Sequence, residues 1–144
     1  MPATDVSPAR PVAHRHRVRV YWEDTDAGGV VFYANYLKFF ERARTEWLRT
    51  AGIGQQALKD ETGAMFVVTD TQVSYRAPAR LDDLLDVTVA VAEAGRVSFT
   101  IAQQAWRDGV LLAEGRIRIG CVDAATLRPR RIPDTVLHAL PPLP

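Results

Sequence analysis

Cysteine and histidine are scarce in this 144-residue sequence, which holds one cysteine and three histidines. The single Cys121 cannot form a disulfide within the chain, and no set of cysteine ligands for zinc exists, so we expect a reducing, cytoplasmic location. His14 and His16 lie near one end of the sequence, His138 lies near the other, and no G-x-S-x-G segment is present. A hydrolase built on a Ser-His or Cys-His pair is therefore not supported.

The sequence also lacks an excess of charge of either sign and any long apolar run. Eighteen Lys and Arg against seventeen Asp and Glu give a formal net charge of +1, which provides no broad field for nucleic acid or an anionic membrane. No apolar run approaches the roughly 20 residues that span a bilayer, and residues 1–13 lack the apolar centre of a secretory signal. We expect a soluble protein with no nucleic-acid partner and no transmembrane segment.

What the chain does have is enough apolar sequence for one domain, with 47% hydrophobic and 24% charged residues. Prolines among small and polar residues predict a flexible tail over residues 1–14, followed by a single domain over residues 15–140. The basic run in residues 14–19 is interpreted as a solvated approach to a first strand, which the alternation of Val18, Val20 and Trp22 indicates.

Hydrophobic periodicity predicts one helix followed by at least four strands. An apolar stripe at spacings of three and four predicts a helix of four to five turns, which Gly52 ends in a left-handed conformation. From Met65 onward the period becomes two, and Asp108-Gly109 is typical of a type I′ hairpin. We therefore predict an α+β fold in which an antiparallel sheet wraps around one long helix. The helical stripe comprises Phe32, Tyr36, Phe39, Phe40, Ala43 and Trp47, and the strand faces comprise Phe66/Val68, Val73/Tyr75, Val87/Val89/Val91, Val97/Phe99/Ile101 and Ile117/Ile119/Cys121.

Two segments imitate ligand-binding motifs without the required context. Residues 52–57 match a dinucleotide-binding pattern, but there a strand should precede and a helix should follow, whereas here a helix ends and strand-like sequence comes soon after. Residues 24–35 begin like a calcium loop, but its fifth position is Gly28 and its twelfth is Asn35, which cannot supply a bidentate carboxylate. Neither function is expected.

Cys121 shares a predicted strand face with Ile117 and Ile119. A buried apolar thiol fits that position better than a nucleophile does.

An acidic turn over residues 23–29 leads into the predicted helix. Ordinary turn chemistry would account for Asp24 and Thr25. The paired Gly28 and Gly29, however, let the backbone approach a ligand where the helix offers free N–H groups and the positive end of its dipole. A carboxylate facing such amides forms a minimal hydrolytic site for a thioester, because a thiolate leaves without a strong acid catalyst. The hypothesis requires that the carboxylate not point into bulk solvent.

Four segments together carry a family resemblance: VRVYWEDTDAGGVVFYANY at residues 18–36, FFERARTEWLR at 39–49, APARLDD at 77–83 and CVD at 121–123. They resemble the hot-dog-fold acyl-CoA thioesterases over roughly residues 17–133, in particular the Tol-Pal system-associated branch and, more distantly, the 4-hydroxybenzoyl-CoA thioesterases. The resemblance implies a hot-dog fold and hydrolysis of acyl-CoA to a carboxylic acid and free coenzyme A, with no metal or other cofactor.

The same resemblance implies roles for the residues of the turn. Asp26 matches the catalytic carboxylate, acting as nucleophile or as general base on water. Tyr33 matches the residue whose backbone N–H polarises the thioester carbonyl, and Gly29 belongs to the substrate-contacting part of the motif. Some members of the Tol-Pal branch have histidine where Tyr33 stands, so Tyr33 departs toward the benzoyl-type pattern and leaves the acyl preference open.

Three further residues are candidates for substrate binding. Glu41 stands where the benzoyl enzymes carry an aspartate near the substrate, with a solvated acid on the helix as the alternative. Arg96 and Ser98 resemble a site that contacts the coenzyme A phosphates, where charge-assisted hydrogen bonds are expected.

The resemblance also implies a homodimer or homotetramer with active sites between subunits. Two other functions stay open: an acyl-thioester hydratase or dehydratase, and a module that binds acyl carrier protein or an envelope complex with little turnover. Acyl chain length and aromaticity are not determined by the sequence.

Overall fold

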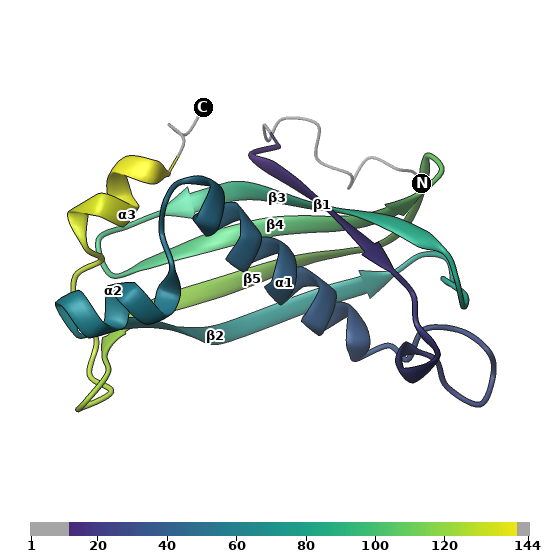
Figure 1. Cartoon of the computed structure of the whole chain (residues 1–144), viewed down its shortest axis with the longest axis horizontal. Helices are drawn as coiled ribbons and strands as arrows, with labels where there is room; N and C mark the ends of the chain where they lie inside the picture. Colours follow the sequence, from purple (N-terminus) through teal and green to yellow (C-terminus); the bar gives the residue numbers. More distant parts are fainter. Residues whose placement is uncertain (1–11, 141–144) are drawn as a thin grey trace.

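A computed structural model describes residues 12–140, which form one antiparallel sheet with helices packed on it. The five strands lie in the order β1-β3-β4-β5-β2, and helix α1 lies across one face of the sheet (Figure 1). No helix of the described residues is long and apolar enough to cross a bilayer. The elements are β1 (His14–Arg19), the short 3-10 helix η2 (Trp22–Asp24), α1 (Asn35–Thr50), α2 (Gln55–Thr62), β2 (Ala64–Tyr75), β3 (Leu84–Ala94), β4 (Ser98–Arg107), β5 (Val110–Asp123) and α3 (Asp134–Ala139).

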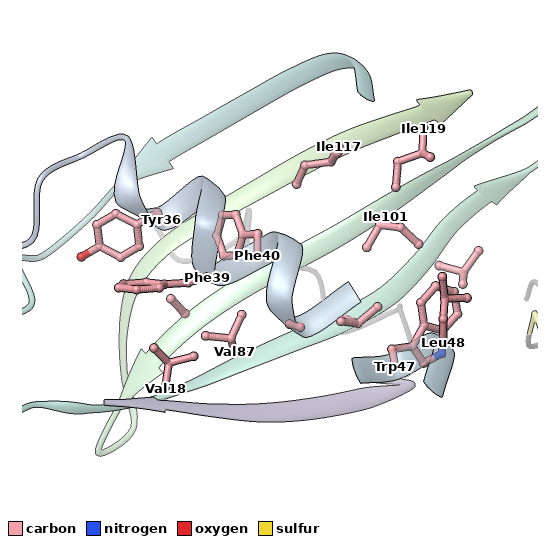
Figure 2. Close-up of a cluster of buried hydrophobic side chains, with 14 of the residues drawn as sticks. Val18, Tyr36, Phe39, Phe40, Trp47, Leu48, Val87, Ile101, Ile117 and Ile119 are labelled. Carbon is pink, nitrogen blue, oxygen red and sulfur yellow. The ribbon is translucent and has the colours of Figure 1, made fainter. Parts of the chain in front are cut away.

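Helix α1 supplies one side of the core. Its buried side chains recur at spacings of three and four, and they project toward sheet residues such as Val87, Ile101 and Ile117 (Figure 2). The ring of Phe40 rests on Gly115 of β5, where a Cβ atom would lie 3.2 Å from Phe40 Cε2. The predicted helix and its left-handed end at Gly52 (φ 80°) are confirmed. The helical face is Tyr36, Phe39, Phe40, Ala43, Trp47 and Leu48.

Phe32, which the sequence placed in the helical stripe, lies outside the helix. The helix begins three residues later, at Asn35, and the Phe32 side chain is 42% exposed. The prediction for Phe32 was wrong because its spacing to Tyr36 matches the helical period, although the backbone between them is still a turn.

The predicted alternation of buried residues along the strands is confirmed, but the residues are divided among the strands differently. Inward residues of β3, β4 and β5 are buried, and Asp108 and Gly109 both have positive φ, as a type I′ hairpin requires. Residues 64–75, predicted as two segments, form one strand with a register shift between Val68 and Asp70. Val97 precedes β4 and is exposed, so it does not share the face of Phe99.

The basic run of residues 14–19 is itself the edge strand β1 rather than an approach to it. It pairs antiparallel with β3, with Val18 opposite Leu85, and Val18 is buried. The chain then turns into η2, so Trp22 is 83% exposed instead of continuing the strand alternation. The predicted tail falls largely on residues 1–11, which lie outside the described residues, while His14 is the first residue of β1. The boundaries of the domain stay a prediction.

Helices α2 and α3 were not predicted. Helix α2 follows Gly54, where strand-like sequence was expected soon, and its eight residues bury only Leu58, so no apolar stripe announces it. Because α1 rather than a strand precedes residues 52–57, the dinucleotide-binding motif remains excluded on context.

Candidate active site

The loop before α1 is held in place by a buried acid. Asp24 is 5% exposed, and its carboxylate accepts hydrogen bonds from the Tyr21 backbone N–H at 2.8 Å and from Asn35 Nδ2 at 2.9 Å. The backbone N–H of Phe32 donates to the carbonyl of Asp24 at 2.8 Å. Asp24 therefore ties η2 to the first residue of α1, which is the turn role that its position suggested.

Asp26 and Gly29 share the exposed tip of this loop. The Asp26 carboxylate accepts one hydrogen bond, from the Gly28 N–H at 2.8 Å, and the Asp26 N–H donates to the Val30 carbonyl at 2.9 Å. Gly29 has φ 79°, a conformation that a side chain would strain. The carboxylate is exposed, so the requirement that it not point into bulk solvent is not met within one chain, and among residues 12–140 it accepts no hydrogen bond from the Tyr33 amide.

Tyr33 presents backbone groups just before α1. Within residues 12–140 its N–H has no hydrogen-bond acceptor, while its carbonyl accepts a hydrogen bond from the Tyr75 hydroxyl at 2.9 Å. The rings of Tyr33 and Tyr75 meet edge to face, with centroids 6.2 Å apart. Burial, and then the nearby Tyr33, raises the pKa of Tyr75, which keeps its hydroxyl protonated as a donor. No sequence pattern indicated this role for Tyr75, since a tyrosine on a strand is ordinarily a packing residue.

Glu41 lies on α1, about 9 Å along the helix axis from Asn35. Its side chain is exposed and accepts a hydrogen bond from the Thr45 hydroxyl. It borders a cavity between α1 and the sheet, into which Arg44 of the same helix also reaches.

Arg96 and Ser98 lie at the opposite end of the sheet. The loop of Asp26 is attached beside the start of β3, through the Val31 N–H bonded to the Ala79 carbonyl, whereas Arg96 follows the end of that strand (Figure 1). Eleven residues of β3 separate the two places by about 35 Å. Ser98 Oγ accepts a hydrogen bond from Arg118 Nη2 at 3.3 Å, a partner that sequence reasoning missed. One chain thus brings Asp26, Gly29 and Tyr33 together but not Arg96 and Ser98.

Cys121 is buried at 1% exposure on the inner face of β5, as predicted. Burial raises the pKa of its thiol, against a smaller opposite effect of Arg130, so the thiol stays protonated and is a poor nucleophile. In residues 12–140 no three His, Cys, Asp or Glu side chains gather in a way that could hold a metal ion.

A curved antiparallel sheet around one long helix, preceded by an Asp- and Gly-containing loop, is the hot-dog class of α+β protein. The chain belongs to the thioesterase-like superfamily, whose family model matches residues 20–140. It is 44% identical over 122 residues to the acyl-CoA thioesterase YbgC of Haemophilus influenzae, which covers 85% of this chain and 90% of the relative.

Two further comparisons agree with this family. Identity is also 44%, over 124 residues, with the acyl-CoA thioester hydrolase YbgC of Escherichia coli O6:H1, covering 85% of this chain and 92% of that protein. The crystal structure of a 1,4-dihydroxy-2-naphthoyl-CoA thioesterase from Synechocystis superposes with a TM-score of 0.82 at 21% identity, over 88% of this chain and 94% of that one. That last likeness supports the fold alone.

Proposed function

We propose that this protein hydrolyses acyl-CoA thioesters to a carboxylic acid and free coenzyme A. The observation that carries the proposal is the loop before α1. It offers an exposed carboxylate on Asp26 and, two positions before the helix begins, a Tyr33 N–H that has no acceptor within the described part of the chain. The relatives named acyl-CoA thioesterase and thioester hydrolase, at 44% identity over most of the chain, support the same substrate class.

The chemistry needs only a base and an oxyanion donor. Asp26 accepts a proton from water while the water oxygen bonds to the thioester carbon, and the carbonyl electrons move to oxygen, where the Tyr33 N–H stabilises them. When the carbonyl re-forms, the C–S bond breaks, and the coenzyme A thiolate leaves and is protonated. As nucleophile, Asp26 would instead form a mixed anhydride that water then cleaves. Neither route needs a metal or a second cofactor.

The site is completed by a second copy of the chain in a homodimer or homotetramer. An exposed Asp26 needs cover to exclude bulk water, and the cations of Arg96 and Arg118 lie too far away in the same chain to meet the same coenzyme A. A partner subunit that brings its own β3–β4 turn to this loop would answer both needs. We expect a cytoplasmic enzyme, whose acyl group arrives on coenzyme A or on acyl carrier protein.

Release of free thiol from acetyl-, hexanoyl- and benzoyl-CoA tests the proposal. Asp26→Asn keeps the side-chain shape and removes the charge, so kcat should fall at least about a hundredfold. Asp60→Asn is the matched control, because Asp60 is also an exposed acid but lies on α2, and it should stay within about twofold of wild type. Full turnover by a folded Asp26→Asn protein would falsify the role of this carboxylate. Hydration of an enoyl-CoA without thiol release would favour the hydratase function instead.

A further inference from the structure

A cavity of about 130 Å³ lies between α1 and the sheet and is used by no residue of the hydrolytic loop. Phe66, Phe99 and Ile119 line its sheet side, and Trp47 and Leu48 line its helix side. The rings of Phe66 and Phe99 meet edge to face with centroids 5.5 Å apart, which gives that wall a fixed apolar surface. An apolar cavity of about 150 Å³ accommodates benzene, so this one suits an apolar body of about six carbons.

One cation enters this apolar space with few partners. Arg44 Nη1 donates to Gln103 Oε1 at 2.9 Å, and within residues 12–140 no carboxylate lies within 4.0 Å of the guanidinium. A guanidinium has five N–H donors, so most of its hydrogen-bonding capacity is unused. Burial lowers the pKa of Arg44 below its ordinary value, against a smaller opposite effect of Glu41, and an arginine stays charged at neutral pH.

Gln103 holds the guanidinium at a fixed place. The Gln103 side chain is fully buried, and its Nε2 donates to the Phe40 carbonyl at 3.0 Å and to the Thr88 carbonyl at 3.3 Å. With the amide nitrogen committed to two backbone carbonyls, its oxygen faces Arg44. The cation is therefore positioned by the core rather than by solvent.

Glu41 does not neutralise this cation. Its carboxylate is exposed at the cavity rim, accepts a hydrogen bond from Thr45, and stays beyond ion-pair distance of Arg44. Because the exposed charge of Glu41 is screened by water, it offsets only part of the desolvation of Arg44. The site thus favours an anion at Arg44.

We propose that this cavity binds a small apolar acid, about six carbons long, whose terminal carboxylate pairs with the Arg44 guanidinium. The inference deepens the proposed function, on which it rests for the source of the ligand: the acid is the acyl group of a thioester held at the Asp26 loop of a second copy, carrying a second carboxylate at its far end. Within one chain Arg44 lies about 13 Å along the helix axis from Asn35, which is farther than six carbons reach. The same chemistry in a free dicarboxylic acid is the other source, and the experiment separates the two.

The kinetic arm compares two thioesters of equal length. Adipoyl-CoA ends in a carboxylate and hexanoyl-CoA ends in a methyl group, so their ratio of kcat/KM isolates the far end of the acyl chain. In the wild type this ratio should favour adipoyl-CoA about tenfold or more, because a charge-assisted pair forms in a desolvated place. Arg44→Met should bring the ratio to about one, and Arg44→Lys should retain part of it. A wild-type ratio below about two excludes the acyl group as the ligand and, without adipate binding in the second arm, overturns the proposal.

The binding arm uses titration calorimetry of adipate and of 1-hexanol, which has six carbons and no carboxylate, with the intact protein. Adipate binding at least about tenfold tighter than 1-hexanol, lost in Arg44→Met, assigns the site to the free acid as well; a kinetic preference without such binding assigns it to the acyl group alone. If no thioester is cleaved, acetyl-CoA included, the proposed function fails while this arm still tests the cavity. Equal, weak binding of both compounds then overturns the inference too.

A second variant keeps the test valid if Arg44→Met does not fold. Val68 is 52% exposed at the cavity rim, so Val68→Phe fills the space without strain in the core. It should lower kcat/KM for both six-carbon thioesters about tenfold relative to acetyl-CoA. An unchanged preference among the three thioesters shows that the acyl group lies elsewhere.

Discussion

The two ends of the sheet differ in the chemistry that they offer. Beside the start of β3, the loop of Asp26 and Tyr33 presents a carboxylate and a free amide, which are groups that act on a carbonyl. Beyond the end of β3 lie two cations, Arg96 and Arg118, and Arg118 donates a hydrogen bond to Ser98. Such groups hold an anion. The difference teaches that, in a single chain, groups suited to acting on a carbonyl and groups suited to holding an anion lie about 35 Å apart.

The largest expected effect concerns this division between two copies. The Asp26→Asn chain should retain about 1% of wild-type kcat/KM, and a chain with Arg96→Ala and Arg118→Ala about a tenth. If each site uses Asp26 of one copy and the cations of another, random co-assembly restores one intact site in every four. Co-expressed, differently tagged chains, assayed at substrate well below KM, should then give about a quarter of wild-type kcat/KM. About one twentieth, the plain average, would place both groups in one copy.

The end of the sheet that carries Arg96, Ser98 and Arg118, called the anion end below, should contribute more to substrate binding than to turnover. Replacing both Arg96 and Arg118 with alanine removes the two cations at this end of the sheet. KM for an acyl-CoA should therefore rise about tenfold, while kcat stays within about twofold. Steady-state kinetics at low and at moderate salt measure the split. An acyl-pantetheine, which lacks the nucleotide phosphates, is the control substrate and should show no difference between the variant and the wild type.

A smaller effect on kcat is expected from Tyr75, which lies at the end of the sheet that carries the loop of Asp26 and Tyr33. Tyr75→Phe keeps the ring contact with Tyr33 and removes only the hydroxyl that bonds the Tyr33 carbonyl at 2.9 Å. Loss of one hydrogen bond that orients the oxyanion donor should lower kcat about three- to tenfold, with KM nearly unchanged. Tyr21→Phe is the matched control, since Tyr21 is 61% exposed and outside this contact. Equal changes in both variants would contradict the positioning role.

The smallest effect is expected at Cys121, which lies near the anion end but points into the core. Because burial raises the pKa of its thiol, an alkylating reagent at neutral pH should leave the native protein unmodified and label it only after unfolding. Cys121→Ala should change kcat less than about twofold and cost about 1 kcal/mol of unfolding free energy. Rapid labelling of the native state, seen by mass spectrometry, would show an accessible thiol instead.

The fold could be predicted wherever a local period carried it. Helix α1, its end at Gly52 and the hairpin at Asp108-Gly109 follow from spacing and turn chemistry, and the family match confirms the predicted hot-dog thioesterase class. Helix α2 was not predicted because it buries only one side chain. The pairing of β2 with β5 was not predicted because no local pattern specifies a partner 49 residues away, as for Thr69 and Arg118.

The candidate site was predictable only in its loop. Asp26, Gly29 and Tyr33 lie in one contiguous motif, so proximity in sequence implied proximity in space. The hydroxyl of Tyr75, the cation of Arg118 and the guanidinium of Arg44 reach their places through tertiary contacts, which sequence spacing does not encode. Their roles, like those of Asp26 and Tyr33, stay predictions for the experiments above.

The missing side chain of Gly115 has a consequence beyond packing. Any added methyl group there would lie 3.2 Å from the Phe40 ring and 3.1 Å from the Gln72 carbonyl, so these neighbours would have to move by a few tenths of an ångström. The cavity beside Arg44 lies between these same two layers, although Gly115 does not line it. A substitution at residue 115 would shift the Phe40 ring while leaving every reacting atom unchanged, which makes this glycine a place where selection could adjust the packing of α1 on the sheet.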